Sequence, residues 1–454
     1  MLLILVGTLA IVSAIEGQAT EQRSAVEQPN VQAPAAPAPG GGDGPKEPAT
    51  PKAKTKKSGP VVKVGSVLSF EFKAKFQGDL HRSYEGAALQ ADLGTFDMPR
   101  QRIGVEGTFL THLEFEVERD FAQKTLTATE IEEQLWQQTP WTDVFVNATY
   151  ARRAQLQAGR FKIPFGRDEL TSIAQNDFVY RSLGAEYLAP ARDTGLMMHG
   201  RLFNRGLSYA IGAFAHDGDH ARSKRIQGGD FTAAFRVTGT PFRSIARLKG
   251  LELGTAFTAS DVSADSFRPN GLRSRTVMTQ DTFFGSVYVA GRRNRWEGDL
   301  EWVAGPSSLR AEYTYVTDDR LDQGFSGEDL PDVRYRSWYV AGSRILTGEK
   351  KTRPIRPRTA FLKGGAGAIE AAARYEEITE DSVGGASAPS RSPRAETIFP
   401  SGDRVLTLGV NWILNRWITI QTNVIREQVP DAARDPVPGG APFWSTVLRV
   451  QFVL

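Results

Sequence analysis

Short segments of alternating apolar and polar residues fill most of the chain after residue 61. Near its start Leu68, Phe70, Phe72, Ala74 and Phe76 alternate with Ser69, Glu71, Lys73, Lys75 and Gln77, and the chain ends on the same pattern at Leu448, Val450, Phe452 and Leu454. Successive side chains of a β-strand point to opposite faces, so each segment predicts a strand with one apolar and one polar face. Such strands suit a wall with lipid on one side and water on the other.

Sixteen segments show this pattern, near residues 67–77, 101–110, 112–121, 141–150, 154–162, 193–202, 206–214, 229–240, 250–260, 294–304, 308–317, 333–345, 367–378, 404–414, 416–427 and 443–454. Most have about the 9 to 11 residues that a tilted strand needs to cross a bilayer. Tight turns, as at His112 and Asn415, alternate with long links such as 163–192 and 261–293. The pattern predicts an all-β fold, a closed antiparallel transmembrane β-barrel of about 16 strands.

A soluble β-sandwich would also alternate strands and turns. Aromatic residues favour the barrel because several lie towards strand ends, where lipid headgroups hold amphipathic rings: Trp296, Trp302, Tyr313, Tyr315, Trp412 and Trp417. No apolar run after residue 15 approaches the roughly 20 residues of a membrane helix. The sequence therefore predicts that strands cross the membrane.

The first sixty residues differ from the rest in composition. Residues 1–19 read as a secretory signal peptide, with apolar runs at 2–6 and 9–12 and small residues for cleavage at 12–14. A short buried helix is the alternative. Residues 20–60 are rich in Pro, Ala and Lys and poor in aromatic and branched residues, which predicts a disordered periplasmic linker. The barrel is expected to span residues 61–454.

The link within Gly159 to Gly200 is long and both apolar and basic, which favours a functional loop over a linker. Its runs GRFKIPFGRDEL, FVYRSL and LAPARDTGLMMHG resemble the third-loop region of the phosphate-selective porins O and P of bacterial outer membranes. GVEG at 104–107, LTGE at 346–349 and LGVNWILN at 408–415 are similar to further family motifs, in the family's order. The resemblance covers the chain from about residue 61 to its end.

The resemblance implies an outer-membrane porin, a homotrimer, with the third loop folded into the lumen. A porin selects solutes by pore radius and rings of charge, and Arg and Lys suit anions such as phosphate. The pore and anion-binding candidates are Lys162, Arg167 and Arg181 on the loop segment, Arg100 and Arg102 before GVEG, and, by strand parity, Arg236, Arg295, Arg310 and Arg374. Carboxylates share these faces at Glu297, Asp299, Glu301, Glu312, Glu370 and Glu376, so neutralised ion pairs are the alternative.

Composition sets outer limits on function. The 454 residues contain no cysteine, which excludes disulfides and thiolate chemistry. Lys and Arg number 55 against 52 Asp and Glu, a net charge of +3, so global charge gives no warrant for nucleic acid. Any anion preference must come from local placement. The basic tract at 350–358 falls on the side of the short turns and is expected to be a solvated turn.

One group of residues resembles a metal site. His216, Asp217, Asp219 and His220 lie in one long link, but a turn gives this spacing no fixed geometry and no distant ligand is evident. A surface loop is the better account, and no cofactor, catalytic set or enzyme activity is expected. The sequence predicts a channel for small hydrophilic solutes that prefers anions such as phosphate or polyphosphate, in contact with outer-membrane lipid and lipopolysaccharide. The alternative is a barrel for envelope attachment or structure, with little transport selectivity.

Overall fold

The computed structural model describes residues 61–84, 95–122, 139–204, 206–219, 231–431, 433 and 440–454. The predicted signal peptide and linker lie outside the described residues. The strands are β1 (Val61–Val64), β2 (Leu68–Tyr84), β3 (Thr95–Phe109), β4 (Leu113–Asp120), β5 (Trp141–Ala151), β6 (Ala154–Lys162), β7 (Arg192–Leu202), β8 (Leu207–Phe214), β9 (Thr232–Gly239), β10 (Leu251–Val262), β11 (Ser274–Arg275), β12 (Thr282–Phe284), β13 (Gly291–Ala304), β14 (Ser307–Arg320), β15 (Leu330–Ile345), β16 (Ala368–Ser382), β17 (Ser401–Ile413), β18 (Ile418–Gln428) and β19 (Phe443–Val453). Short helices are α3 (Arg167–Leu170), η1 (Ile173–Gln175), η2 (Gly184–Leu188) and η3 (Phe361–Lys363).

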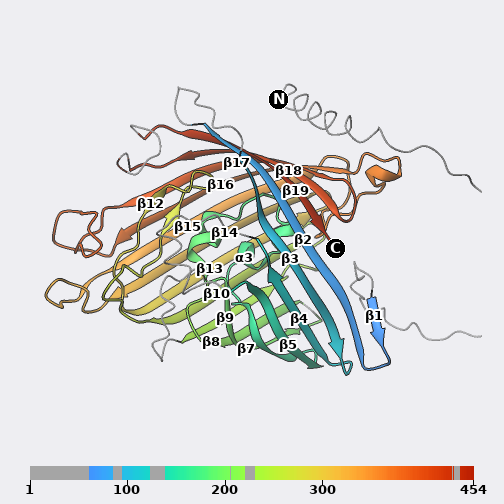
Figure 1. Ribbon diagram of the computed structural model, residues 1–454, viewed down its shortest axis with the longest axis horizontal. Coiled ribbons are helices and arrows are strands. Elements are labelled where there is room, and N and C mark those ends of the chain that lie inside the picture. Colours follow the sequence, from blue (N-terminus) through green and yellow to red (C-terminus); the bar gives the residue numbers. More distant parts are fainter. Residues whose placement is uncertain are drawn as a thin grey trace, which may run out of the picture. The chain divides into compact units, whose positions relative to one another are not determined.

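Sixteen of these strands form one closed antiparallel barrel (Figure 1). Each strand from β2 to β10 pairs with its neighbour in sequence, β10 pairs with β13, and the series continues to β19. The last strand, β19, pairs with β2 and closes the sheet, with Arg449 opposite Asp79. The short β1 pairs with the first residues of β2, beyond the point where β19 ends. The predicted sixteen-stranded barrel is confirmed.

The two faces of the barrel wall have the reverse polarity of a soluble protein. On β14 the buried positions include Arg310, Glu312 and Asp318, whereas Leu309 and Tyr313, which are next to them in sequence, are 40% and 37% exposed. The same alternation recurs along the other strands, and four of the largest fully buried side chains are arginines. A wall with apolar residues outside and charges inside is what a lipid-spanning barrel around an aqueous interior requires.

Some strands are longer than the alternating segments that predicted them. β2 reaches Tyr84 and β3 begins at Thr95, whereas the alternation predicted strands that end at 77 and begin at 101. Backbone pairing continues there, as between Leu80 and Phe96, although the residues become more polar. Hydrophobic alternation marks only the part of a strand that meets hydrocarbon, so it stops before the ladder of hydrogen bonds does.

An apolar core lies against the buried face of the later strands. Val179, Leu183 and Leu188 from the segment 163–191 pack with Leu272, Phe283 and Phe284 from the segment 263–290. The strand residues in the same cluster are Val316, Val333, Tyr335, Ile378, Val405, Ile425 and Val447. This core includes β12, which with β11 forms a small sheet inside a segment that the sequence pattern assigned to a loop.

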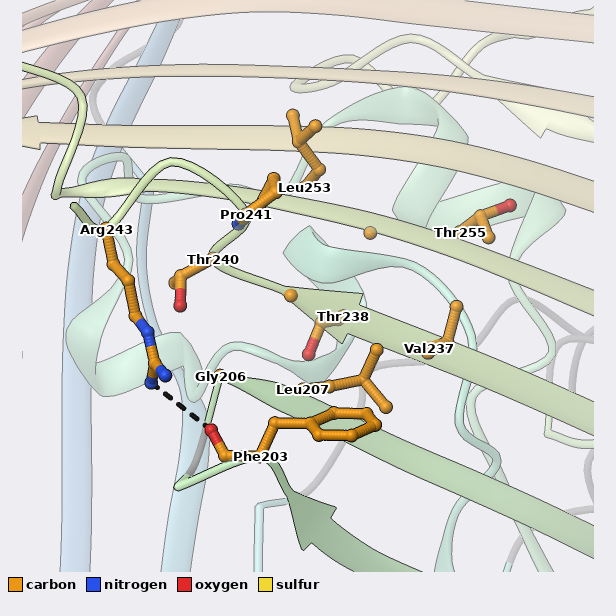
Figure 2. A pocket seen from close by; sticks show the side chains of 12 residues that line it. Phe203, Gly206, Leu207, Val237, Thr238, Thr240, Pro241, Arg243, Leu253 and Thr255 are labelled. Atoms are coloured by element: carbon orange, nitrogen blue, oxygen red, sulfur yellow. Dashed lines mark hydrogen bonds between the residues drawn. The ribbon is translucent and has the colours of Figure 1, made fainter. Parts of the chain in front are cut away.

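A groove of about 490 Å³ opens near the short turns of β8, β9 and β10 (Figure 2). Its lining includes Phe203, Leu207, Val237, Leu253 and Arg243. No helix in the described part of the chain has both the length and the apolarity to span a membrane.

Candidate functional site

The segment 163–191 is held in shape by its own polar residues. It turns at Gly166, whose φ of 72° suits glycine, and α3 follows. The Asp168 carboxylate then accepts the backbone N–H of Ser182 at 2.7 Å and the side-chain amide of Asn176 at 3.1 Å. Burial would raise the pKa of Asp168, but the nearby Arg181 guanidinium outweighs it and the pKa is lowered. One ionised carboxylate therefore joins the two halves of the segment.

Side chains from the buried face of β16 to β19 bind the backbone of this segment. Their contacts to its carbonyl oxygens are Arg374 to Tyr180 and Arg181, Asn411 to Asp177, Gln421 to Asn176, Arg449 to Val179 and Gln451 to Ala174, at 2.7 to 3.2 Å. The strands also accept its N–H groups, since Glu376 bonds Leu183 and Asn423 bonds Val179. Backbone groups of the segment that its short helices leave unpaired are met by these side chains.

Arg167 binds the segment to the strands on another side. Its guanidinium contacts Asp299, Glu252 at 2.8 Å and Glu301 at 3.1 Å. Arg236 also contacts Asp299, and it pairs with Glu297 at 2.7 Å. Burial opposes the charged form of Arg167, yet these carboxylates outweigh it and raise its pKa. Arg167 is therefore charged but neutralised by its partners, and it anchors the loop.

The turn between β15 and β16 reaches the same segment. Lys351 Nζ lies 2.6 Å from Asp177 and also contacts Glu370, and Arg353 lies 3.1 Å from Asp177 and 2.7 Å from Glu301. Burial raises the pKa of Asp177, but the two cations outweigh it and lower the pKa to about 2. The expectation of a solvated turn is wrong for Lys351 and Arg353, because nothing in the local sequence shows that they meet an acid from a distant loop.

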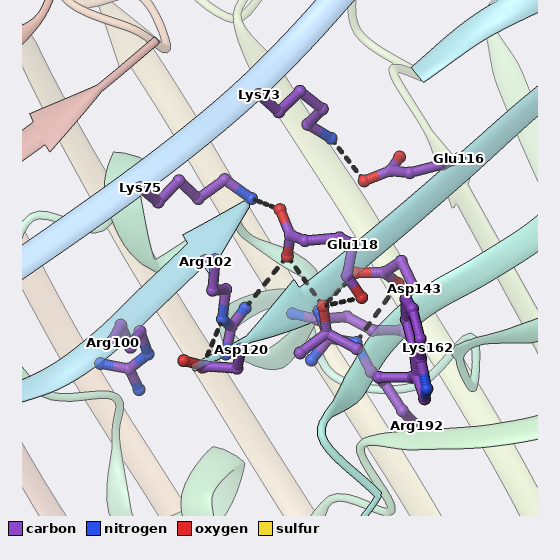
Figure 3. Close-up of polar contacts among 12 residues, drawn as sticks. Lys73, Lys75, Arg100, Arg102, Glu116, Glu118, Asp120, Asp143, Lys162 and Arg192 are labelled. Atoms are coloured by element: carbon purple, nitrogen blue, oxygen red, sulfur yellow. Dashed lines mark hydrogen bonds and ion pairs between the residues drawn. The ribbon is translucent and has the colours of Figure 1, made fainter. Parts of the chain in front are cut away.

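Several charged side chains on β2 to β7 are partly exposed to solvent. Charged side chains on β2 to β7 form a ladder (Figure 3), named here the charged ladder: Lys73, Lys75, Arg100, Arg102, Glu106, Glu116, Glu118, Asp120, Asp143, Lys162 and Arg192. The side chains of Arg102, Lys75 and Arg192 are 14%, 17% and 15% exposed, whereas Arg295 of β13 and Arg449 of β19 are fully buried. Solvent therefore reaches the buried face of the barrel along β2 to β7.

Most rungs of the charged ladder are ion pairs. The pairs are Lys73 with Glu106 at 2.9 Å, Lys75 with Glu118 at 2.7 Å, Arg102 with Asp120 at 2.8 Å, Lys162 with Glu169 at 3.1 Å and Arg192 with Asp143 at 2.9 Å. Arg100 differs. Its Nη1 donates to the Gln77 side chain at 3.1 Å, and among the described residues no carboxylate is paired with it.

The structure brings some of the predicted residues together and separates others. Arg167 and Arg236 share Asp299, and Lys162 and Arg181 share Glu169. Arg100 and Arg102 lie on one face of β3. Arg295 pairs with Asp217, and Arg310 pairs with Glu301. Sequence reasoning did not select Lys73 and Lys75 as site residues, although strand parity places them on the polar face of β2. It also missed the contacts of Lys351 and Arg353, for which the sequence holds no signal.

The residues that resembled a metal site have other partners. Asp217 pairs with Arg293 at 2.7 Å and with Arg295, and His216 Nδ1 lies 3.3 Å from Asp193. His220 lies outside the described residues. Within the described ranges, no group of three or more His, Cys, Asp or Glu is placed to hold a metal ion.

The sequence profile of one protein family, described as phosphate-selective porin O and P, matches residues 70–453. The chain belongs to this family. The match spans the whole barrel, so this porin is a channel protein of the bacterial outer membrane. Family and fold both point to a channel and not to an enzyme. A comparison with curated proteins finds no match.

Solved outer-membrane proteins share the fold of this porin at low sequence identity. In-vitro folded OmpT of Vibrio cholerae is 11% identical, with a TM-score of 0.53 over 87% of this chain and 99% of that chain. The outer-membrane channel DcaP of Acinetobacter baumannii is 11% identical, with a TM-score of 0.52 over 87% and 99%. A trimer form of OmpT is 11% identical, with a TM-score of 0.51 over 86% and 100%. At this identity the likeness shows the fold alone.

Proposed function

We propose that this porin passes small hydrophilic solutes along the charged ladder and prefers anions, phosphate among them. The observation that carries the proposal is the contrast between the two parts of the wall. In the charged ladder the side chains of Lys75, Arg102 and Arg192 are 14% to 17% exposed, whereas Arg295 of β13 and Arg449 of β19 are fully buried. A hydrated solute needs such a wetted path.

In this proposal the segment 163–191 crosses the lumen and sets the width of the channel. Its two ends continue β6 and β7, while its middle binds side chains of β16 to β19. These attachments lie on separate parts of a closed wall, so the loop has to run through the interior to reach both. The path then lies between this loop and the charged ladder.

The preference for anions rests on Arg100. Paired charges of the ladder largely cancel at the distance of a passing ion, but Arg100 has an amide partner instead of a carboxylate. Arg102 follows on the same face of β3 and binds Asp120 through its Nε at 2.8 Å. A guanidinium presents several N–H groups to phosphate oxygens. The many ion pairs imply a modest preference, weaker than that of a pore lined by unpaired cations.

Planar-bilayer recording tests both parts of the proposal. The wild-type protein should give discrete channels with a reversal potential on the anion side, and Arg100→Gln should shift that potential towards cations. A unit charge at 4 Å is worth about 1 kcal/mol in water and about 4 at an effective dielectric of 20. Even about 1 kcal/mol corresponds to a roughly fivefold change in permeability ratio.

Arg268→Gln is the matched control, because Arg268 is an exposed arginine in the segment 263–290. Its charge is screened over about 8 Å at physiological salt, so its removal should leave the reversal potential nearly unchanged. Equal reversal potentials for wild type and Arg100→Gln would refute the role of Arg100 but not the channel itself.

A second candidate function is a barrel for envelope attachment or structure, which the packing of several segments on the buried face favours. The segments 163–191 and 263–290 and the turn that carries Lys351 all pack on the buried face of β13 to β19. A barrel that inserts into the bilayer but shows no conductance steps would support this candidate over the channel.

The assembly in the membrane is also a proposal. A homotrimer is supported by the trimer form of OmpT, which shares the fold. Lipid and lipopolysaccharide are the expected neighbours of the exposed apolar face, where Val146, Leu196, Ile211 and Val450 are each close to half exposed. Crosslinking in native membranes, with bands at one, two and three chains, tests the trimer.

A further inference from the structure

The groove near the short turns lies on the apolar outer face of the barrel. Leu207 of β8, Gly239 of β9 and Leu253 of β10 stand side by side in the strand register. Leu253 is 37% exposed, and Phe257 and Phe235 further along the same faces are 44% and 41% exposed, as lipid-facing residues are. The groove therefore opens towards the membrane and not towards the charged ladder.

Gly239 forms the floor of the groove because it has no side chain between the two leucines. A Cβ placed on Gly239 would lie 3.3 Å from the Gly206 carbonyl oxygen and 4.0 Å from Leu207 Cδ1. A longer side chain at this position would therefore project into the groove. Val237 and Thr255, opposite each other in the register, continue the lining away from the turns (Figure 2).

The rim of the groove is cationic. The segment 240–250 between β9 and β10 carries Arg243, Arg247 and Lys249 and no acidic residue. Arg243 Nη1 donates to the carbonyl oxygens of Phe203 at 3.2 Å and Asn204 at 3.4 Å, which holds the guanidinium at the mouth of the groove (Figure 2). In the described part of the chain, none of these three cations is paired with a carboxylate.

Aromatic and apolar residues mark this rim as the level of the membrane surface. Trp302 stands next to Leu251 in the register, and its indole N–H donates to the Arg247 carbonyl oxygen at 3.1 Å. Phe203 is 75% exposed, and Phe242 and Ile245 in the segment 240–250 are 39% and 49% exposed. Tryptophan with exposed apolar residues and cations is the composition of a membrane interface. Short turns of such barrels face the periplasm.

We propose that the groove binds a phospholipid of the periplasmic leaflet, with one acyl chain between Leu207 and Leu253 and the phosphodiester at Arg243. The apolar trough matches a hydrocarbon chain, and the guanidinium matches phosphate oxygens. Arg247 and Lys249 add positive charge around the headgroup, so an anionic lipid such as phosphatidylglycerol binds more tightly than a zwitterionic one. This site is separate from the solute path.

Native mass spectrometry of the full-length protein, titrated with phosphatidylglycerol, tests the site. The wild type should retain one lipid per chain, more tightly than phosphatidylethanolamine. Arg243→Gln should weaken binding by about tenfold, the factor that loss of a charge-assisted hydrogen bond produces. Gly239→Leu should remove the tightly bound lipid by filling the trough. Arg356→Gln is the control, since Arg356 is an exposed arginine in the short-turn segment between β15 and β16.

Three results would overturn the proposal. The first is an equal lipid affinity of the wild type and Arg243→Gln. This comparison tests the proposal even if Gly239→Leu does not fold. The second is an equal loss of affinity in Arg356→Gln. The third is loss of the oligomer in Arg243→Gln with lipid binding intact, which would make the groove a contact between copies of the chain.

Discussion

The ion pair that joins the first and last barrel strands gives a prediction about stability. Asp79 of β2 faces Arg449 of β19, and two parallel hydrogen bonds of 2.7 and 2.6 Å connect their side chains. The third arm of Arg449 reaches the Val179 carbonyl oxygen at 2.7 Å. The two side chains are 0% and 1% exposed. This pair therefore links barrel closure with the loop 163–191.

Asp79→Asn keeps the shape of the side chain and removes its charge. The guanidinium of Arg449 then stays buried without its paired carboxylate, which in proteins costs about 3 to 5 kcal/mol. We expect the variant to lose that amount of unfolding free energy and to unfold at a lower temperature than wild type. Heat-modifiability on semi-native gels and denaturant titration in detergent micelles measure the change.

Arg334 and Asp381 supply a matched control. They form the same two-bond pair on the neighbouring strands β15 and β16, at 2.6 and 3.0 Å, but both side chains are 28% exposed. Surface pairs contribute about 0 to 1 kcal/mol, so Asp381→Asn should be nearly neutral. If Asp79→Asn costs no more stability than Asp381→Asn, the buried pair does not hold the barrel closed.

Other outcomes follow from the termini and from the loop. Removal of Phe452–Leu454 should abolish membrane assembly, because Phe452 and Val453 pair with β2 and Leu454 bonds the backbone of Ala74; normal heat-modifiable barrels from the truncated chain would contradict this. The pKa of Asp177 is lowered to about 2, so its carboxylate stabilises the loop fully at any pH above about 3.9, the ordinary pKa of Asp. This stabilisation is lost as the pH falls towards 2. Single-channel current noise should rise over that pH range in the wild type, and in Asp177→Asn it should already be high near neutral pH. Quiet currents in Asp177→Asn would show that Asp177 does not anchor the loop. Limited proteolysis of the folded protein should remove residues 20–60 and leave one heat-modifiable core, whereas several soluble fragments would argue against a single barrel.

The strands were predictable from sequence because each one meets lipid on one face, which imposes a period of two along the whole crossing. Contact with lipid constrains each residue of a crossing strand by its own position, so it is visible in the sequence. The small sheet of β11 and β12 was not predictable, because its residues pack against a loop and other strands instead of lipid. Where a segment leaves the hydrocarbon, its contacts are set by distant parts of the chain.

The candidate site was predictable only in part. Arg236 and Arg310, which strand parity put on the polar face of their strands, are buried. The partners of these cations depend on which strands are neighbours and on which loop residues contact them. Asp299, for example, serves both Arg167 and Arg236, which are far apart in sequence. The neutralisation that the sequence left open is therefore observed for most candidates, with Arg100 as the exception among the described residues.

The unequal packing of the barrel wall gives its two parts different roles in the proposed channel. Strands β13 to β19 carry the interlocked loops and hold the fold, whereas the wetted charges stand on β2 to β7, in the first half of the chain. In a nanopore sensor built on this porin, the charges on β2 to β7 could therefore be changed without altering the packed strands β13 to β19. In the proposed channel, charges such as Lys75 and Arg102 are the positions for tuning the current.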